Sequence, residues 1–224
     1  DSVVWQESRP AEKGRNVVMR RATDGTLQEL NPAPWNARTR VHEYGGRAYL
    51  MDRGVLFFSH FADQRLYRVD PGQAPRPITP EASALRYADL CADARRRLLW
   101  AVREDHRGAG EACNSLVALR ADGDEQGGRI VAEGHDFYAA PRLSPDGSQL
   151  AWLSWNHPDM PWDGCELWLA EVDAAGRLHG ARCLAGSRDE AVQQPMWSPD
   201  GRLHFISDRS GWWNLYRWVD GAAE

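Results

Sequence analysis

A short acidic turn recurs along this chain at nearly constant spacing. Successive aspartates of these turns lie 46 to 52 residues apart, at Asp24-Gly25, Asp70-Pro71-Gly72, Asp122-Gly123, Asp173 to Gly176 and Asp220-Gly221. A period of this length is typical of β-propeller blades, which contain about four strands each. The spacing therefore predicts one supersecondary unit repeated along the whole chain.

The clearest copy of the unit lies near the C-terminal end. The turn Pro199-Asp200-Gly201 precedes residues 202–207 (RLHFIS), and a second turn, residues 208–211 (DRSG), precedes residues 213–220 (WNLYRWVD). Proline presets φ, aspartate can bind the backbone two residues on, and glycine accepts a positive φ. The apolar runs are rich in aromatic and β-branched residues, so we expect them to be strands.

We expect an all-β fold, a β-propeller of four-stranded antiparallel blades, with about five blades present as an incomplete arc. With strands named a to d from the inside outward, the first blade offers only b, c and d, and the last stops before d. The two ends would not complete one blade between them, so we expect this chain to be part of a longer polypeptide that covers the exposed blade faces. Helical periodicity is weak, and its best candidate, Glu81 to Arg86, is expected to be a loop turn. The predicted blades span residues 1–30, 46–79, 86–133, 139–185 and 194–220.

Composition excludes several classes of function. The formal charge of −5 has no basic stripe behind it, so nucleic acid is not expected as a partner. No apolar run reaches the roughly 18 residues of a membrane span, and no signal peptide begins the sequence, although residue 1 need not be the native N-terminus. The absence of N-x-S/T sequons favours a cytoplasmic bacterial location. The four cysteines form no CxxC pair, and we expect no metal and no cofactor.

The long segments are all predicted to fall at one end of the blades. In a four-stranded meander the a–b and c–d turns share one end, and the b–c and d–a loops share the other. The second end collects residues 31–46, 104–114, 156–165 and 208–213. Irregular loops on a rigid scaffold commonly carry function, so we name this end the working face and expect it to contact substrate or partner.

Seven residues on this face are candidates for the substrate path or for a domain interface. His42, Glu43 and Tyr44 would form a polar cluster at the channel rim, although a loop anchored by a buried His and Tyr is the alternative. Trp162 and Asp163 lie in a loop that could dock a partner or gate a substrate. Asp208 and Arg209 could form an ion pair within their turn.

No catalytic motif is present. The sequence has no G-x-S-x-G, H-E-x-x-H or Walker loop, and no Ser, His and Asp group into a triad by spacing. The chain alone is therefore not expected to be an enzyme.

Several segments resemble the propeller of the prolyl oligopeptidase family of serine peptidases, most closely its bacterial dipeptidyl aminopeptidase and acylaminoacyl peptidase branch. HEYGG and HPDMPWDG are more particular to this resemblance than the SPDG and SDRSG elements, which TolB-type propellers share. The similarity covers essentially the whole chain. The segments are Val41 to Tyr49, Phe61 to Asp70, Asp136 to Gly147, His157 to Val172 and Trp197 to Arg217.

The resemblance implies an N-terminal propeller that caps a C-terminal α/β-hydrolase domain of the same polypeptide and admits only short or unfolded peptides. The triad would belong to the hydrolase domain, so no catalytic residue is carried over to this chain. The candidates on the working face would then be neighbours of the substrate path.

Two other functions stay open. A TolB-like, non-enzymatic interaction propeller is the main alternative, and a carbohydrate-active propeller such as a lyase, with His and metal ligands over the channel, is another. Aminopeptidase, acyl-peptide and endopeptidase specificities are not separated by these residues.

Overall fold

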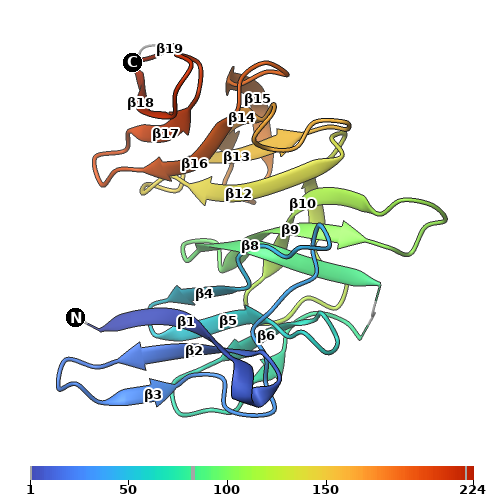
Figure 1. Cartoon of the computed structure of the whole chain (residues 1–224), viewed down its shortest axis with the longest axis vertical. Coiled ribbons are helices and arrows are strands. Elements are labelled where there is room, and N and C mark those ends of the chain that lie inside the picture. The colour runs from blue at the N-terminus through green and yellow to red at the C-terminus, as the bar shows by residue number, and fades with distance from the viewer. Residues whose placement is uncertain (1, 82–83, 220) are drawn as a thin grey trace.

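A computed structural model describes residues 2–81, 84–219 and 221–224. These residues form five antiparallel sheets that follow one another as the blades of an arc, with the first and last blades at opposite ends (Figure 1). The all-β, unclosed propeller expected from the turn spacing is confirmed. The turn expected at Asp220-Gly221 and the middle of the segment Glu81 to Arg86 include residues outside the described ones.

Each blade is a meander in chain order. The first blade has three strands: β1 (Val3–Arg9), β2 (Arg15–Arg21) and β3 (Leu27–Glu29). The second blade contains β4 (Tyr49–Asp52), β5 (Val55–Ser59), β6 (Leu66–Val69) and β7 (Arg76–Pro77). The third contains β8 (Leu85–Asp93), β9 (Leu98–Asp105), β10 (Cys113–Arg120) and β11 (Arg129–Ala132). The fourth contains β12 (Phe137–Leu143), β13 (Gln149–Trp155), β14 (Glu166–Val172) and β15 (Leu178–Ala185). The fifth contains β16 (Val192–Trp197), β17 (Leu203–Ser207), β18 (Asn214–Val219) and β19 (Ala222–Ala223).

The last blade differs from the prediction that it stops before strand d. The two-residue strand β19 pairs with β18, with Trp218 opposite Ala223, and completes a four-stranded sheet. Two alanines carry neither the alternation nor the β-branched side chains that signal a strand, so the sequence pattern missed it. The only helical element among the described residues is a 3-10 turn at Pro10–Glu12, and none of their helices is long and apolar enough to cross a membrane.

The inner edge of the arc is built from β4, β8, β12 and β16, and each of these strands approaches the inner strand of a neighbouring blade. Three of these strands carry a bulge at which a non-glycine residue adopts a positive φ: Asp89 (54°), Ala140 (50°) and Gln194 (51°). A bulge bends its strand and redirects the neighbouring side chains. The repeated position shows that this bend is a property of the blade unit.

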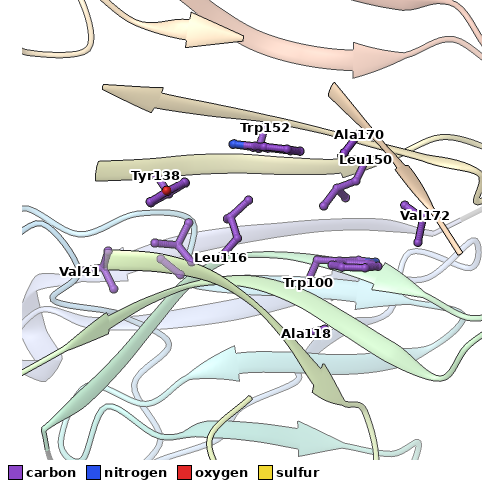
Figure 2. Close-up of a cluster of buried hydrophobic side chains, with 11 residues drawn as sticks. Val41, Trp100, Leu116, Ala118, Tyr138, Leu150, Trp152, Ala170 and Val172 are labelled. Carbon is purple, nitrogen blue, oxygen red and sulfur yellow. The ribbon is translucent and has the colours of Figure 1, made fainter. Parts of the chain in front are cut away.

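The core lies between the blades. On β9, Trp100 and Val102 pack toward the fourth blade, while Leu99 and Ala101 pack toward the second. On the facing blade, Leu150 and Trp152 belong to the same cluster as the first pair, and Figure 2 shows them across from Trp100. Successive side chains of a strand point to opposite faces, so a blade that is covered on both faces needs apolar residues at every position.

The SPDG turn that signalled the repeat is held by its own side chains. In the fourth blade, the Gly147 N–H donates to the Ser144 carbonyl oxygen (2.9 Å), and the Ser148 N–H donates to the Asp146 carboxylate (3.0 Å). Hydrogen bonds from the Ser144 hydroxyl and from Ser148 lower the pKa of Asp146 to about 2. The aspartate-to-backbone contact two residues on is therefore present in the fourth blade. At Asp200, for which it was predicted, the Arg202 N–H donates instead to the Ser198 hydroxyl oxygen at 3.1 Å, and the Asp200 carboxylate accepts a hydrogen bond from that hydroxyl.

Substitution of the inter-blade core is expected to cost far more than substitution of a blade surface. Leu150→Ala removes a fully buried side chain at the third–fourth blade interface and should lower the free energy of unfolding by about 3 to 5 kcal/mol. Leu215→Ala, at a side chain that is 70% exposed, is the matched control and should change it by less than about 0.5 kcal/mol. Urea denaturation measures both, and equal losses would contradict this account of the core.

Candidate functional site

The segment HEYGG, ahead of β4, folds as a tight left-handed turn. His42 and Glu43 adopt φ values of 55° and 63°, and Gly45 follows at 90°. The Glu43 N–H donates to the Arg40 carbonyl oxygen, and the Gly45 N–H donates to that of Val41, both at 2.9 Å. A side chain on Gly46 would lie 3.0 Å from the Cβ atom of Ala88, so glycine permits close approach to the third blade.

Burial anchors this turn on both sides. Val41 is fully buried in the cluster between the third and fourth blades (Figure 2). The His42 ring lies 5.4 Å from the rings of Phe137 and Trp155, centroid to centroid. Its Nε2 atom is buried and has no hydrogen-bond partner among the described residues. Burial lowers the pKa of His42, against the opposing charge of Glu104. Tyr44 is 63% exposed, so only the histidine matches the predicted alternative of a buried anchor.

Glu104 is the centre of the polar contacts here. It lies at the end of β9, is 4% exposed, and accepts a hydrogen bond from the His42 backbone N–H at 3.0 Å. Its other oxygen pairs with Arg86 (3.1 Å) and with the Nε2 atom of His106 (2.9 Å). A buried carboxylate is stable only with such partners.

Arg86 joins this carboxylate to the left-handed turn. Its Nη1 donates to the Arg40 carbonyl oxygen at 3.0 Å and pairs with Glu43 at 2.6 Å. The hydrogen bond and charge of Arg86 lower the pKa of Glu43. Arg86, Glu104 and His106 were not among the residues predicted for the site. Glu104 and His106 lie in the long segment 104–114, which was their only signal in the sequence, and strand β8 gave no signal for Arg86.

A cavity of about 410 Å³ opens beside this network. Its wall includes Asn114, which is 8% exposed and lies opposite Glu104 in the β9–β10 pairing. The Asn114 Nδ2 donates to the Asp136 carbonyl oxygen at 2.8 Å, but its Oδ1 has no partner among the described residues. The cavity is lined by His42, Glu43, Glu104, His106, Gly110, Glu111, Ala112, Asn114, Asp136, Phe137 and His157.

The carboxylates and the amide oxygen of this wall are hydrogen-bond acceptors. It presents four carboxylates and an unpaired amide oxygen, so a ligand that brings N–H groups or positive charge is favoured. Glu43, Glu104 and His106 place one ligand atom each within 4.8 Å of one another, as a metal ion would require. The Arg86 guanidinium, however, already pairs with both carboxylates and opposes a second cation there.

Trp162 and Asp163 lie on the same face but do not line this cavity. Trp162 is 59% exposed, and the Asp163 carboxylate accepts a hydrogen bond from the Met160 N–H (3.1 Å) within its own loop. The loop is held to the fifth blade by a hydrogen bond from Gln193 to the Pro161 carbonyl oxygen (2.7 Å). From this segment, only His157 reaches the cavity.

The ion pair predicted between Asp208 and Arg209 is wrong. Arg209 pairs instead with Glu190 at 2.9 Å, and the Asp208 carboxylate accepts a hydrogen bond from the Ala191 N–H, also at 2.9 Å. Both partners precede β16, and only the packing of the blade brings them to this turn. Neither Asp208 nor Arg209 lines the cavity.

Comparison with solved structures finds strong similarity over the full chain. A mutant of puromycin hydrolase complexed with PGG is 41% identical with a TM-score of 0.91, and a puromycin-hydrolyzing peptidase of Mycobacterium tuberculosis is 40% identical with a TM-score of 0.89. Each match covers 100% of this chain and 37% of the other, so the chain spans little over a third of these relatives. A putative TolB from Agrobacterium tumefaciens, 16% identical over 100% of this chain and 68% of its own, with a TM-score of 0.61, shows the fold alone. Neither protein-family models nor curated proteins gave a match.

Removing the charge of Glu104 should destabilise the fold. Glu104→Gln leaves Arg86 with one carboxylate and weakens the contact to His106, and we expect a loss of about 3 kcal/mol in the free energy of unfolding. Glu43→Gln removes the exposed partner of the same arginine and should cost less than about 1 kcal/mol. Chemical denaturation at pH 7 compares them, and a larger loss for the Glu43 variant would contradict the central place of Glu104.

The half-buried His42, whose Nε2 atom is buried, should make stability depend on pH. The unfolded chain protonates His42 near its usual 6.5, whereas the folded pKa is lowered, so its stabilising contribution is complete above 6.5 and is lost as pH falls through the folded pKa. His42→Phe keeps an aromatic ring against Phe137 and Trp155 but cannot titrate. Denaturation between pH 7.5 and 5 should give a shallower loss for this variant, by at most about 1.4 kcal/mol per pH unit. Parallel curves would show that His42 does not titrate in this way.

Proposed function

We propose, from the confirmed resemblance of this chain to the propellers of the prolyl oligopeptidase family, that it is the substrate-gating, non-catalytic propeller of a serine peptidase acting on short peptides. The observation that carries the proposal is the match over the full chain, at 41% identity, to part of a puromycin hydrolase. The catalytic groups would lie in a C-terminal α/β-hydrolase domain of the same polypeptide, toward which the working face would turn.

The acceptor wall of the cavity supports a finer proposal about the substrate. A protonated amino end carries one positive charge and three N–H donors, which match the two carboxylates that Arg86 does not contact, Glu111 and Asp136, and the Oδ1 atom of Asn114, which has no partner among the described residues. An N-acylated peptide end is neutral and offers one donor. The cavity therefore favours an aminopeptidase of the dipeptidyl type over an acylaminoacyl peptidase, with His42 and Glu43 beside the substrate path.

The other candidate residues would have a supporting role in the proposed function. Tyr44 and Trp162 are exposed aromatic side chains on loops of the working face, which suits contact with the hydrolase domain or with a passing peptide. Asp163 holds the conformation of the Trp162 loop, and Asp208 and Arg209 hold their own turn against Ala191 and Glu190. A TolB-like interaction propeller has only fold-level similarity in its favour.

The sequence that follows Glu224 in the gene tests the main proposal. We expect it to encode an α/β domain with a G-x-S-x-G motif, and the joined polypeptide to hydrolyse short peptides. A stop codon soon after Glu224, or a joined polypeptide without peptidase activity, would contradict the proposal.

Peptide binding tests the finer proposal. The 224-residue chain should bind triglycine amide more tightly than N-acetyl-triglycine amide, and Glu111→Gln with Asn114→Ala should abolish that preference by removing a carboxylate of the cavity wall and an acceptor that has no partner among the described residues. Glu125→Gln, at an exposed position between β10 and β11, is the charge-matched control. Titration calorimetry measures the affinities. Equal affinity for the two peptides would exclude an amine site.

A further inference from the structure

Asp89 joins three inner strands at one point of the arc's inner edge. One oxygen of its carboxylate accepts a hydrogen bond from the Arg47 backbone N–H, and the other accepts one from the Ala140 N–H, both at 2.9 Å. Its own N–H donates to the Arg47 carbonyl oxygen, also at 2.9 Å. The Asp89 carboxylate, on the third blade, therefore bridges backbone N–H groups of the second-blade and fourth-blade segments at this point.

Two arginines flank this junction, Arg47 before β4 and Arg142 on β12, and we name them the inner-edge pair. Arg142 follows Ala140 by two residues and is half-buried, and Arg47 is exposed. The only hydrogen bond of the Arg142 guanidinium within the described residues is to the Pro141 carbonyl oxygen, at 2.7 Å. Four of its five N–H donors therefore remain available.

Neither guanidinium of the inner-edge pair has a carboxylate within ion-pairing distance in the described part of the chain. Most other half-buried arginines here do, as Arg86, Arg96 and Arg68 show. Burial and then the charge of Arg47 lower the pKa of Arg142, and the charge of Asp89 opposes this shift. One carboxylate does not balance the charge of two guanidinium groups. A half-buried charge without a counter-ion is costly, so this arrangement calls for an anion.

We propose that the inner-edge pair binds the terminal carboxylate of a short peptide. The pair and Asp89 together carry one net positive charge, which a monoanion neutralises, and the planar guanidinium of Arg142 can bind two carboxylate oxygens side by side. Arg47 follows directly, in the sequence, the turn that bears His42 and Glu43. One short segment therefore has the cavity at one end and Arg47 of the inner-edge pair at the other. This inference rests on the proposed function only in taking a peptide as the ligand.

The test uses the 224-residue chain and peptides whose amino end is blocked, so that the acceptor cavity does not contribute. We expect N-acetyl-triglycine to bind at least tenfold more tightly than N-acetyl-triglycine amide in titration calorimetry. Arg142→Gln should abolish this preference. Arg182→Gln, at an exposed position on β15, should leave it unchanged. Circular dichroism and thermal melting check folding, and if the Arg142 variant does not fold, the exposed Arg47→Gln carries the same expectation.

Three results would overturn the proposal: equal affinity for acid and amide, a preference that survives both variants, or tighter binding of inorganic phosphate than of the free-acid peptide, which would identify a phosphate site. Failure of the amine proposal is a separate result, because it is read from peptides with a blocked carboxyl end. Those peptides do not engage the inner-edge pair.

Discussion

Burial of both faces of each middle blade is the constraint on which the rest of the structure depends. A strand alternates its side chains between two faces, so Leu99 and Trp100 on β9 serve different interfaces although they are neighbours in sequence. Stacked sheets with this pattern hold one another in place, and the loops between strands are free to vary. The rigid position of Glu104 and Asn114, opposite each other on β9 and β10, follows from that packing.

Local signals in the sequence predicted the fold well, because turns and strands are local. The strands expected in residues 202–207 and 213–220 are observed as β17 (Leu203–Ser207) and β18 (Asn214–Val219). The bulges at Asp89, Ala140 and Gln194 could not be predicted from the residue types. Of the three, only aspartate is enriched at positive φ, so the tertiary contacts of the strands must cause the other two. The two-residue strand β19 was missed because its pairing, and not its side chains, defines it.

The candidate site was predicted in part. HEYGG was recognised as unusual, and the structure explains it by a left-handed turn and a close approach to Ala88. The partners of that turn could not be found, because the His42 contact to Glu104 spans 62 residues and that of Glu43 to Arg86 spans 43. The sequence shows which residue types are present. The negative cavity wall and the positive inner-edge pair form only when residues of three blades come together.

The contacts of Arg86 have a mechanical consequence. Its guanidinium holds the Arg40 carbonyl oxygen and Glu43, ahead of the second blade, and Glu104 on the third, while Asp136, Phe137 and His157 close the cavity from the fourth. Three blades thus share one small wall, and close-packed interfaces transmit displacement instead of absorbing it. Rotation of the second, third or fourth blade against its neighbour must change the width of the cavity, so its shape reports the curvature of this part of the arc.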